Sequence, residues 1–226
     1  MAEKFIIKFS KSGYAKYTSH LDLLRFFKRA FRKSGVALKY SQGFNPHPKL
    51  GFAQPLSLGY SSSCELLEFE TADNLNAEDI CEAITKEMPE GLEIQWCREA
   101  TGLDKPLASV CESAEYQVTI PFSADTEFLN HVKNGYLEQE SITALKRRKR
   151  DKKMVETDIK AKIRRFEVRA LGENTVLDME LDSGSVSNCS PELVISSFCS
   201  YAGIDTPRYD MEVERMSLKF YNNLQF

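Results

Sequence analysis

The sequence predicts an α+β protein built from two tandem ferredoxin-like sandwiches, each with the element order β-α-β-β-α-β. Stretches with the alternating pattern of strands and stretches with helical periodicity follow one another in an order that occurs twice. Between the two halves, residues 101–109 have the composition of a linker. We therefore expect one domain at 1–100, a linker at 101–112 and a second domain at 113–226.

The first half contains four strand candidates and two helix candidates. Residues 4–9 alternate between polar and apolar and are rich in β-formers, and the other strand candidates are 36–40, 65–70 and 92–97. The first helix begins after Ser19, which suits the N-cap position, and ends at Gly35, which suits the position after a helix. The second helix begins near Asn76 and ends at Pro89.

The first helix is amphipathic, and its outer surface is basic. Its apolar face is formed by Leu23, Leu24, Phe27, Ala30 and Phe31. The side chains that lie largely on the other side are Arg25, Lys28, Arg29, Arg32 and Lys33. The pattern predicts a helix that packs on a core and presents cations to solvent.

The second half repeats this order with one addition. Its strand candidates are 115–122, 163–171, 175–182 and a stretch within 211–220. Its helices are expected to run from Ser123 to Asn134-Gly135 and from Ser190-Pro191 to Gly203. The basic segment 141–160 has no counterpart in the first half, and we expect it to be an inserted hairpin.

The composition is that of a soluble globular protein. Of the 226 residues, 42% are hydrophobic and 28% are charged, which excludes disordered, collagen-like and coiled-coil classes. No apolar run approaches the roughly 20 residues that a membrane-spanning helix needs. The N-terminal sequence lacks the apolar stretch and cleavage pattern of a signal peptide. We therefore expect a cytoplasmic protein.

The cysteines and histidines form no metal-binding pattern. The six cysteines include no CxxC pair, and the spacing that would hold an iron–sulfur cluster is missing. With three histidines in the chain, a zinc site is unsupported. We expect no bound metal, and we expect the cysteines to be buried small apolar residues or surface thiols without a role.

Charge is segregated along the chain. The net charge is −3, yet residues 1–50 hold 11 Lys and Arg against 2 Asp and Glu, and residues 144–169 hold 12 against 4. The other 150 residues therefore carry a charge of −20. Because screening limits each charge to a range of about 10 Å, an anionic partner senses such blocks rather than the total. The two blocks, one of which includes KRRKRDKK (146–153), favour nucleic acid or another polyanion as the partner.

The stretch YSQGFNPHPKLGFAQPLSLG (40–59) predicts a stiff loop. Pro46 and Pro48 restrict the residues before them, and glycines on either side permit turns. The side chains that the loop would present are Asn45, His47 and Lys49, with Phe44 and Phe52 as apolar anchors. Amide, imidazole and ammonium groups suit the recognition of a phosphate or a base edge. The alternative is a structural connection in which His47 has no role.

A second constellation surrounds the start of the first helix. Its members are Tyr14, Tyr17, Ser19, His20, Asp22 and Arg25. Helix starts attract anions, and a histidine near a tyrosine and lysines would suit general acid–base chemistry in metal-free RNA cleavage. The alternative, which we favour, is a capped helix start with a surface histidine. The chain contains no phosphate-binding loop, dinucleotide fingerprint, nucleophile elbow or HExxH motif.

Residues 18–70 resemble the bacterial radical-SAM-linked domain family, whose activity is not established. The resemblance depends on an SHLDL helix start (19–23), GFNPHP (43–48) and a P-L-x-x-G element (55–59). That domain occurs fused to a radical SAM protein or is encoded beside one. The resemblance implies a radical SAM partner that binds the iron–sulfur cluster and S-adenosylmethionine, because this chain lacks the CxxxCxxC motif. It also points to RNA processing or modification.

These observations lead to one main hypothesis and two alternatives. In the main hypothesis the chain is an accessory module, without a cofactor, that holds tRNA or rRNA for a radical SAM enzyme. The RNA would lie on the two basic blocks and on the free sheet face, which is the face of each predicted sheet that its two helices do not cover. The predicted RNA-binding residues are His20, Arg25, Arg29, Arg32, Asn45, His47, Lys49, Lys146, Arg147, Arg148, Lys149 and Arg150.

The first alternative is a metal-independent endoribonuclease with His20 as general acid or base and Tyr17 nearby. The chain lacks the glycine-rich C-terminal segment of the tandem ferredoxin-like CRISPR RNA-processing nucleases, which counts against this alternative. The second alternative is a purely protein-binding subunit of a radical SAM complex.

Overall fold

The computed structural model describes residues 4–148 and 150–221. They form two compact units, of which one contains the chain up to Cys111 and the other contains Glu112–Lys219. Both units combine helices with antiparallel strand pairs. The α+β class predicted from the sequence is confirmed.

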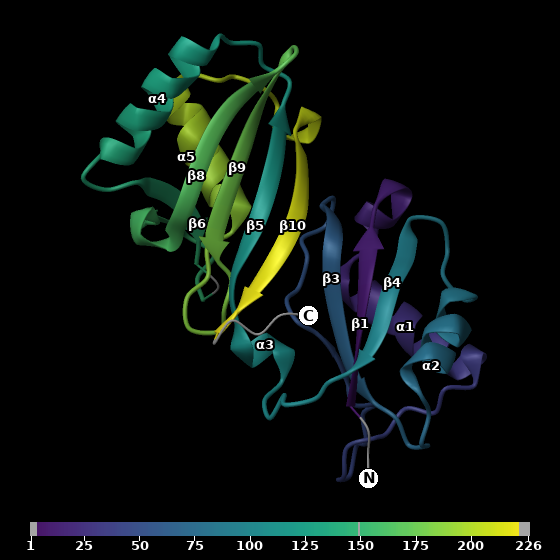
Figure 1. The fold of residues 1–226 in the computed structure, drawn as a ribbon. Coiled ribbons are helices and arrows are strands. Elements are labelled where there is room, and N and C mark those ends of the chain that lie inside the picture. Colours follow the sequence, from purple (N-terminus) through teal and green to yellow (C-terminus); the bar gives the residue numbers. More distant parts are fainter. Residues whose placement is uncertain (1–3, 149, 222–226) are drawn as a thin grey trace. The chain divides into compact units, whose positions relative to one another are not determined.

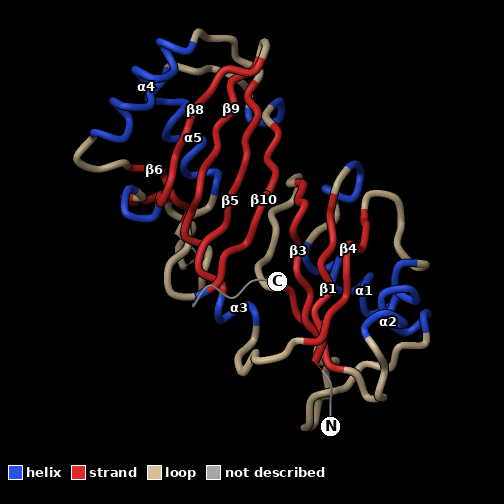
Figure 2. Tube along the Cα trace, viewed as in Figure 1, coloured by secondary structure: helices blue, strands red, loops and turns tan. Residues whose placement is uncertain are grey.

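The first unit contains four strands and three α-helices. The elements in chain order are β1 (Lys4–Lys11), η1 (Gly13–Tyr17), α1 (His20–Ser34), β2 (Leu50–Phe52), β3 (Ser61–Glu70), α2 (Ala77–Thr85), β4 (Leu92–Glu99) and α3 (Leu107–Val110). β1 pairs antiparallel with both β3 and β4, and β2 pairs antiparallel with the other edge of β3. The strand order in this unit is therefore β4-β1-β3-β2. Figure 2 shows β4, β1 and β3 side by side.

One face of this sheet packs against α1 and α2 (Figure 1). Phe27 of α1 lies 5.0 Å from Phe9 of β1, and Phe31 lies 4.6 Å from Phe69 of β3, measured between ring centroids. The limits of α1 agree with the sequence prediction. Ser19 occupies the N-cap position, and Gly35 ends the helix in the left-handed region with φ of 80°.

The strand predicted at 36–40 is wrong. In this stretch only Leu38 and Tyr40 form isolated bridges, to Thr71 and Pro48. The second strand is instead Leu50–Phe52, inside the stretch that we expected to be a loop. The Ser41 and Lys49 N–H groups donate to the His47 and Lys39 carbonyls, each at 2.8 Å, on either side of the bridge between Tyr40 and Pro48. The pairing extends no further than this single bridge, so no ladder forms.

The second unit contains a four-stranded sheet and a separate two-stranded hairpin. Its elements are β5 (Cys111–Ile120), α4 (Thr126–Glu138), β6 (Thr143–Arg147), β7 (Met154–Asp158), η2 (Lys160–Lys162), β8 (Ile163–Leu171), β9 (Asn174–Asp182), α5 (Pro191–Ala202), η3 (Arg208–Asp210) and β10 (Glu212–Phe220). The sheet order is β10-β5-β9-β8, and β6 pairs only with β7. The hairpin formed by β6 and β7 lies within the predicted insertion at 141–160.

α4 and α5 cover one face of the four-stranded sheet (Figure 1). Tyr136 of α4, Phe166 of β8 and Phe198 of α5 pack mutually, with ring centroids between 5.1 and 5.4 Å apart. α5 has the predicted limits: Ser190 is its N-cap, Pro191 is its first residue, and Gly203 follows it with φ of 68°.

The predicted limits of α4 are wrong at both ends. The N-cap is Asp125 rather than Ser123, and the Asp125 carboxylate accepts a hydrogen bond of 2.7 Å from the Phe128 N–H. The helix also continues through Asn134-Gly135 to Glu138. A Cβ at Gly135 would collide with the Tyr201 hydroxyl, so this glycine permits close helix packing and does not end the helix. In the predicted linker at 101–112, the short helix α3 precedes β5.

Candidate functional site

The start of α1 holds the SHLDL motif in a capped helix turn. The Ser19 hydroxyl accepts a hydrogen bond of 3.2 Å from the Asp22 N–H and lies 2.7 Å from the Asp22 carboxylate. Arg25 donates to the same carboxylate at 2.8 Å. These bonds to Ser19 and Arg25 lower the pKa of Asp22. His20 is half-buried, and its ring packs edge-on against Phe52 with the centroids 5.2 Å apart.

The exposed face of α1 carries cations with and without acidic partners. Arg25 pairs with Asp22, and Lys33 pairs with Glu87 at 2.6 Å. Lys28, Arg29 and Arg32 have no acidic partner among the residues that the structure describes, and both arginines are exposed. α1 therefore offers a short row of cations, part of which is already neutralised.

The GFNPHP motif forms the tip of a small hairpin. Tyr40 and Pro48 form its last bridge, and the Ser41 N–H and hydroxyl bond to the backbone of His47 at 2.8 and 3.0 Å. Phe44 at the tip is fully exposed, and Asn45 and His47 are exposed. Phe52, the other apolar anchor expected in this stretch, is buried against Phe9 and Phe27.

Lys49, which we predicted to contact RNA, lies in the stem of this hairpin. Its amino group donates to both carboxylate oxygens of Glu70 at 2.8 and 2.9 Å, and Lys39 lies 3.6 Å from the same carboxylate. Burial alone would raise the pKa of Glu70, but the bonds and charges of Lys49 and Lys39 outweigh it and lower the pKa. Both lysines of the stem therefore face a carboxylate, and the tip at 41–47 carries no formal charge.

The structure does not bring His20 and His47 together. The α1 start follows the Lys11 end of β1, whereas the hairpin adjoins Glu70, which pairs with Lys4 at the other end of β1. The two ends are separated by the length of that strand, about 23 Å. The P-L-x-x-G element, in contrast, reaches the α1 start, because the Gly59 N–H donates to the Lys16 carbonyl at 2.8 Å.

The β6–β7 hairpin, which we call the arm, is the most basic feature of the second unit. Its base is buried through Ile142, Ala144 and Ile159, and Ser197 of α5 donates to the Thr143 carbonyl at 3.0 Å. Beyond that base Val155 and Thr157 are half-buried, and the other described side chains of the arm are exposed. The exposed cations in the described part of the arm are Lys146, Arg147, Arg148, Arg150, Lys152 and Lys153.

Few of these arm cations are neutralised. Arg148 lies 3.5 Å from Asp151, and the Arg147 guanidinium donates to the Lys152 carbonyl at 3.3 Å. Of the described arm residues, no other cation lies within ion-pair distance of a carboxylate. Lys149, also predicted to bind RNA, lies outside the described residues.

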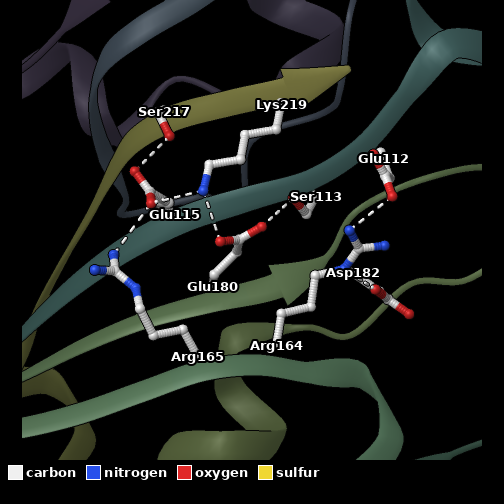
Figure 3. A network of polar contacts seen from close by, with 9 residues as sticks. All are labelled: Glu112, Ser113, Glu115, Arg164, Arg165, Glu180, Asp182, Ser217 and Lys219. Atoms are coloured by element: carbon white, nitrogen blue, oxygen red, sulfur yellow. Dashed lines mark hydrogen bonds and ion pairs between the residues drawn. The ribbon is translucent and has the colours of Figure 1, made fainter. Parts of the chain in front are cut away.

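The sheet face opposite α4 and α5 carries a charge network that the sequence did not reveal (Figure 3). The Lys219 amino group lies 2.6 Å from Glu180 and 3.0 Å from Glu115. Arg165 contacts Glu115 at 3.1 Å, and Ser217 donates to the same carboxylate at 2.7 Å. These five side chains come from β10, β9, β5 and β8, so the network crosses all four strands.

Further pairs extend this network along the sheet. Arg164 bonds to both Glu112 and Asp182 at 2.8 and 2.6 Å, and these bonds raise the pKa of the guanidinium. Arg169 pairs with Asp178 at 2.9 Å. Because each of these cations already has a carboxylate, the face is a poor platform for phosphates. In the sequence these strands show only alternating polar residues. Which charged side chains pair across strands depends on the strand register, which the sequence does not give.

Within the described residues, no group of three or more His, Cys, Asp or Glu side chains is placed to hold a metal ion. None of the six cysteines forms a disulfide, and five of them are buried. No helix in the described part of the chain is long and apolar enough to cross a membrane.

Comparison with known proteins gives a family and a likeness of fold. A family model described as "Uncharacterized protein conserved in bacteria" (DUF2344) matches residues 4–191. No curated protein matches the chain. A chain in the crystal structure of a Cbf5-Nop10-Gar1 complex is 12% identical with a TM-score of 0.52, over 93% of this chain and 47% of that one. The present chain thus spans about half the length of that match, and the likeness shows the fold alone. An unknown protein from Galdieria sulphuraria matches with 10% identity and a TM-score of 0.30, over 95% of this chain and 99% of that one.

Proposed function

The chain belongs to the DUF2344 family, and we propose that this member is an accessory RNA-binding module that holds tRNA or rRNA for a radical SAM enzyme. In this proposal the partner binds the iron–sulfur cluster and S-adenosylmethionine, and carries out the chemistry. The partner is inferred from the resemblance of the SHLDL and GFNPHP motifs. The RNA is inferred from the charge distribution.

The observation that carries the RNA part of the proposal is the unpaired charge of the arm. Cations on the neighbouring sheet face are held by carboxylates, whereas Lys146, Arg150, Lys152 and Lys153 have none within ion-pair distance among the described residues. A phosphate can contact an unpaired cation without displacing an acid, and such contacts dominate affinity for nucleic acids. We therefore assign RNA binding to the arm and to α1, and not to the free sheet face.

We further propose that each unit is a ferredoxin-like sandwich. The strand orders β4-β1-β3-β2 and β10-β5-β9-β8 support this. In each sheet the fourth strand of the β-α-β-β-α-β unit lies beside the first, followed by the third and the second, and both helices cover one face. The arm is then an insertion between α4 and β8, anchored on α5.

The experiment that tests RNA binding compares two triple variants over a range of salt concentrations. The first is Lys146→Ala, Arg147→Ala and Arg150→Ala. The matched control removes the same charge from exposed positions of the first unit with Lys86→Ala, Arg98→Ala and Lys105→Ala. Affinity for tRNA and for rRNA fragments is measured by filter binding, and folding of both variants is checked by circular dichroism.

The arm variant should bind RNA more weakly, and its plot of log affinity against log salt should be shallower by about 2, because each phosphate contact contributes about 0.7–0.9 to the slope. The control should resemble the wild type. Equal slopes for the arm variant and the wild type would exclude the arm as the RNA-binding surface.

A second candidate, a protein-binding subunit, is favoured by the hairpin tip. Phe44 is fully exposed on a tip without formal charge, which is the character of an aromatic anchor for an apolar pocket. Phe44→Ala should then abolish co-elution with the radical SAM protein in the absence of RNA, whereas Tyr40→Ala in the stem should not. Co-elution of the Phe44 variant at wild-type levels would rule out this anchor.

A further inference from the structure

Two exposed tyrosines lie on one side of the short helix η1. Tyr14 is 91% exposed and Tyr17 is 62% exposed, whereas Ala15 between them is buried. In a 3₁₀-helix, with three residues per turn, side chains three residues apart lie directly above one another. Tyr14 and Tyr17 have this spacing, so both exposed rings lie on the same side of η1, and the Lys16 amino group lies 5.4 Å from the centroid of the Tyr17 ring. Exposed apolar side chains that form one contiguous patch are a feature of interaction sites.

The backbone beneath the two rings is held rigidly. Lys11 is buried, and its amino group donates to the carbonyls of Lys16 and Thr18 at 3.3 and 3.0 Å. The Gly59 N–H donates to the Lys16 carbonyl at 2.8 Å. A platform that is ordered before binding loses little conformational entropy when a ligand arrives.

The tyrosines lead directly into the cations of α1. Leu21, Arg25, Lys28 and Arg32 are spaced three or four residues apart, so they follow one side of the helix, about 6 Å per step at most. Arg29 lies beside this row. Asp22 is the one acidic residue in the helix, and it is paired with Arg25. An aromatic pair therefore stands at the N-terminal end of a row of cations.

We propose that η1 and α1 together form a binding site for an unpaired strand of RNA, and this rests on the proposed RNA-binding function. Bases stack on the rings of Tyr14 and Tyr17, and the phosphates that follow lie along Lys28, Arg29 and Arg32. Aromatic rings combined with a cationic track are the means by which proteins hold single strands without reading their sequence.

The chemistry favours a single strand over a duplex and over a protein. Bases in a duplex are stacked on one another and offer no free face to a tyrosine, whereas an unpaired base does. A protein partner would bury the tyrosines without needing the unpaired cations beside them. The module would therefore select RNA with an unpaired segment, such as a loop or an end.

The test uses a synthetic single strand of about eight uridines with one 2-aminopurine, and a hairpin duplex of equal length. Stacking of 2-aminopurine on an aromatic ring quenches its fluorescence, so the readout reports contact as well as affinity. The variants are Tyr14→Ala with Tyr17→Ala, the corresponding pair of Phe substitutions, and Tyr40→Ala as an exposed tyrosine outside the site.

The wild type should bind the single strand more tightly than the duplex and should quench the probe. The double Ala variant should lose about tenfold or more in affinity for the single strand, together with the quenching, at an unchanged salt slope. The double Phe variant and Tyr40→Ala should behave as the wild type. Changes in the tyrosines leave the arm intact, so duplex affinity should not fall.

Two outcomes overturn the inference in distinguishable ways. If the wild type binds RNA and the double Ala variant binds the single strand equally well, the tyrosine site is wrong and the proposed function stands. If the wild type binds neither RNA form at any salt concentration, the proposed function falls and this site falls with it.

Discussion

Lys219 holds together the charge network on the sheet of the second unit, so its removal should have a measurable and pH-dependent cost. Its amino group bonds to Glu180 at 2.6 Å and to Glu115 at 3.0 Å (Figure 3). Glu115 and Glu180 lie directly opposite one another on β5 and β9. Lys219→Met would keep most of the side-chain length but leave two carboxylates facing each other.

The expected loss follows from the exposure of the groups. The Lys219 side chain is 45% exposed, and those of Glu115 and Glu180 are 26% and 14% exposed. Pairs of this kind contribute about 0.2–1 kcal/mol each, and like charges directly opposite across strands add a small repulsion. Lys219→Met should therefore lower the free energy of unfolding by about 1–2 kcal/mol at pH 7.

The loss should shrink in acid. Burial alone would raise the pKa of Glu115 and of Glu180, but bonds to Lys219 and to Ser217 or Ser113 outweigh it and lower both pKa values. A carboxyl with a lowered folded pKa contributes stability above its unfolded pKa, and this contribution disappears as the pH falls through the folded pKa. The difference between wild type and variant should therefore be full at pH 7 and much smaller near pH 3.

Urea unfolding followed by circular dichroism at several pH values measures this difference. Lys86→Met, which breaks an exposed pair with Glu82 on α2, serves as the control and should change little. An equal loss for Lys219→Met at pH 7 and in acid would refute the electrostatic reasoning and indicate a packing role for the Lys219 stem.

Two further predictions concern a glycine and the cysteines. A Cβ at Gly91 would lie 2.5 Å from the Ser12 carbonyl, at φ of 86°, so Gly91→Ala should destabilise the first unit by about 3 kcal/mol in the same unfolding assay. Gly102→Ala, with φ of 73° and open space around it, should cost about 1 kcal/mol, and equal losses at the two positions would contradict a clash. In the native protein Cys81 should be the cysteine that reacts quickly with a thiol reagent at pH 8, because it is half-buried whereas the other five cysteines are buried. Burial raises the pKa of Cys97 to about 12 and those of Cys189 and Cys199 to about 11, and fast reaction of several thiols in a spectrophotometric assay would be inconsistent with this burial.

Helix ends could be predicted where local chemistry decides them. Ser19 and Gly35 bound α1, and Ser190 and Gly203 bound α5, because capping hydrogen bonds and the left-handed conformation involve only neighbouring residues. Gly135 led to a wrong prediction of the end of α4, because what requires a glycine at this position is a contact with another helix. The Tyr201 hydroxyl, from α5, occupies the space that a side chain at 135 would need.

The second strand was missed because pairing, and not propensity, decides which residues form it. Residues 36–40 are good β-formers, yet only Leu38 and Tyr40 form single bridges. Gly51, a poor strand former, pairs with Glu68 because the chain passes along the edge of β3 at that point. Propensity is a weak guide for short edge strands, and no feature of the sequence indicates which neighbour is available.

Counting charges along the sequence located the basic regions, but it overstated the cations that an anionic partner can use. Lys49 in the first block and Arg165 in the second are both held by carboxylates. A phosphate that contacted Arg165 would have to displace Glu115 or lie beside it. The free energy gained when the RNA releases a counterion would then be offset by repulsion between the phosphate and the Glu115 carboxylate. The salt slope of RNA binding should therefore follow the number of unpaired cations on α1 and the arm, and should fall short of the value that the composition of the two blocks implies. A slope that decreased when Arg165 was replaced would show that the network opens for RNA, and would return the free sheet face to the binding surface.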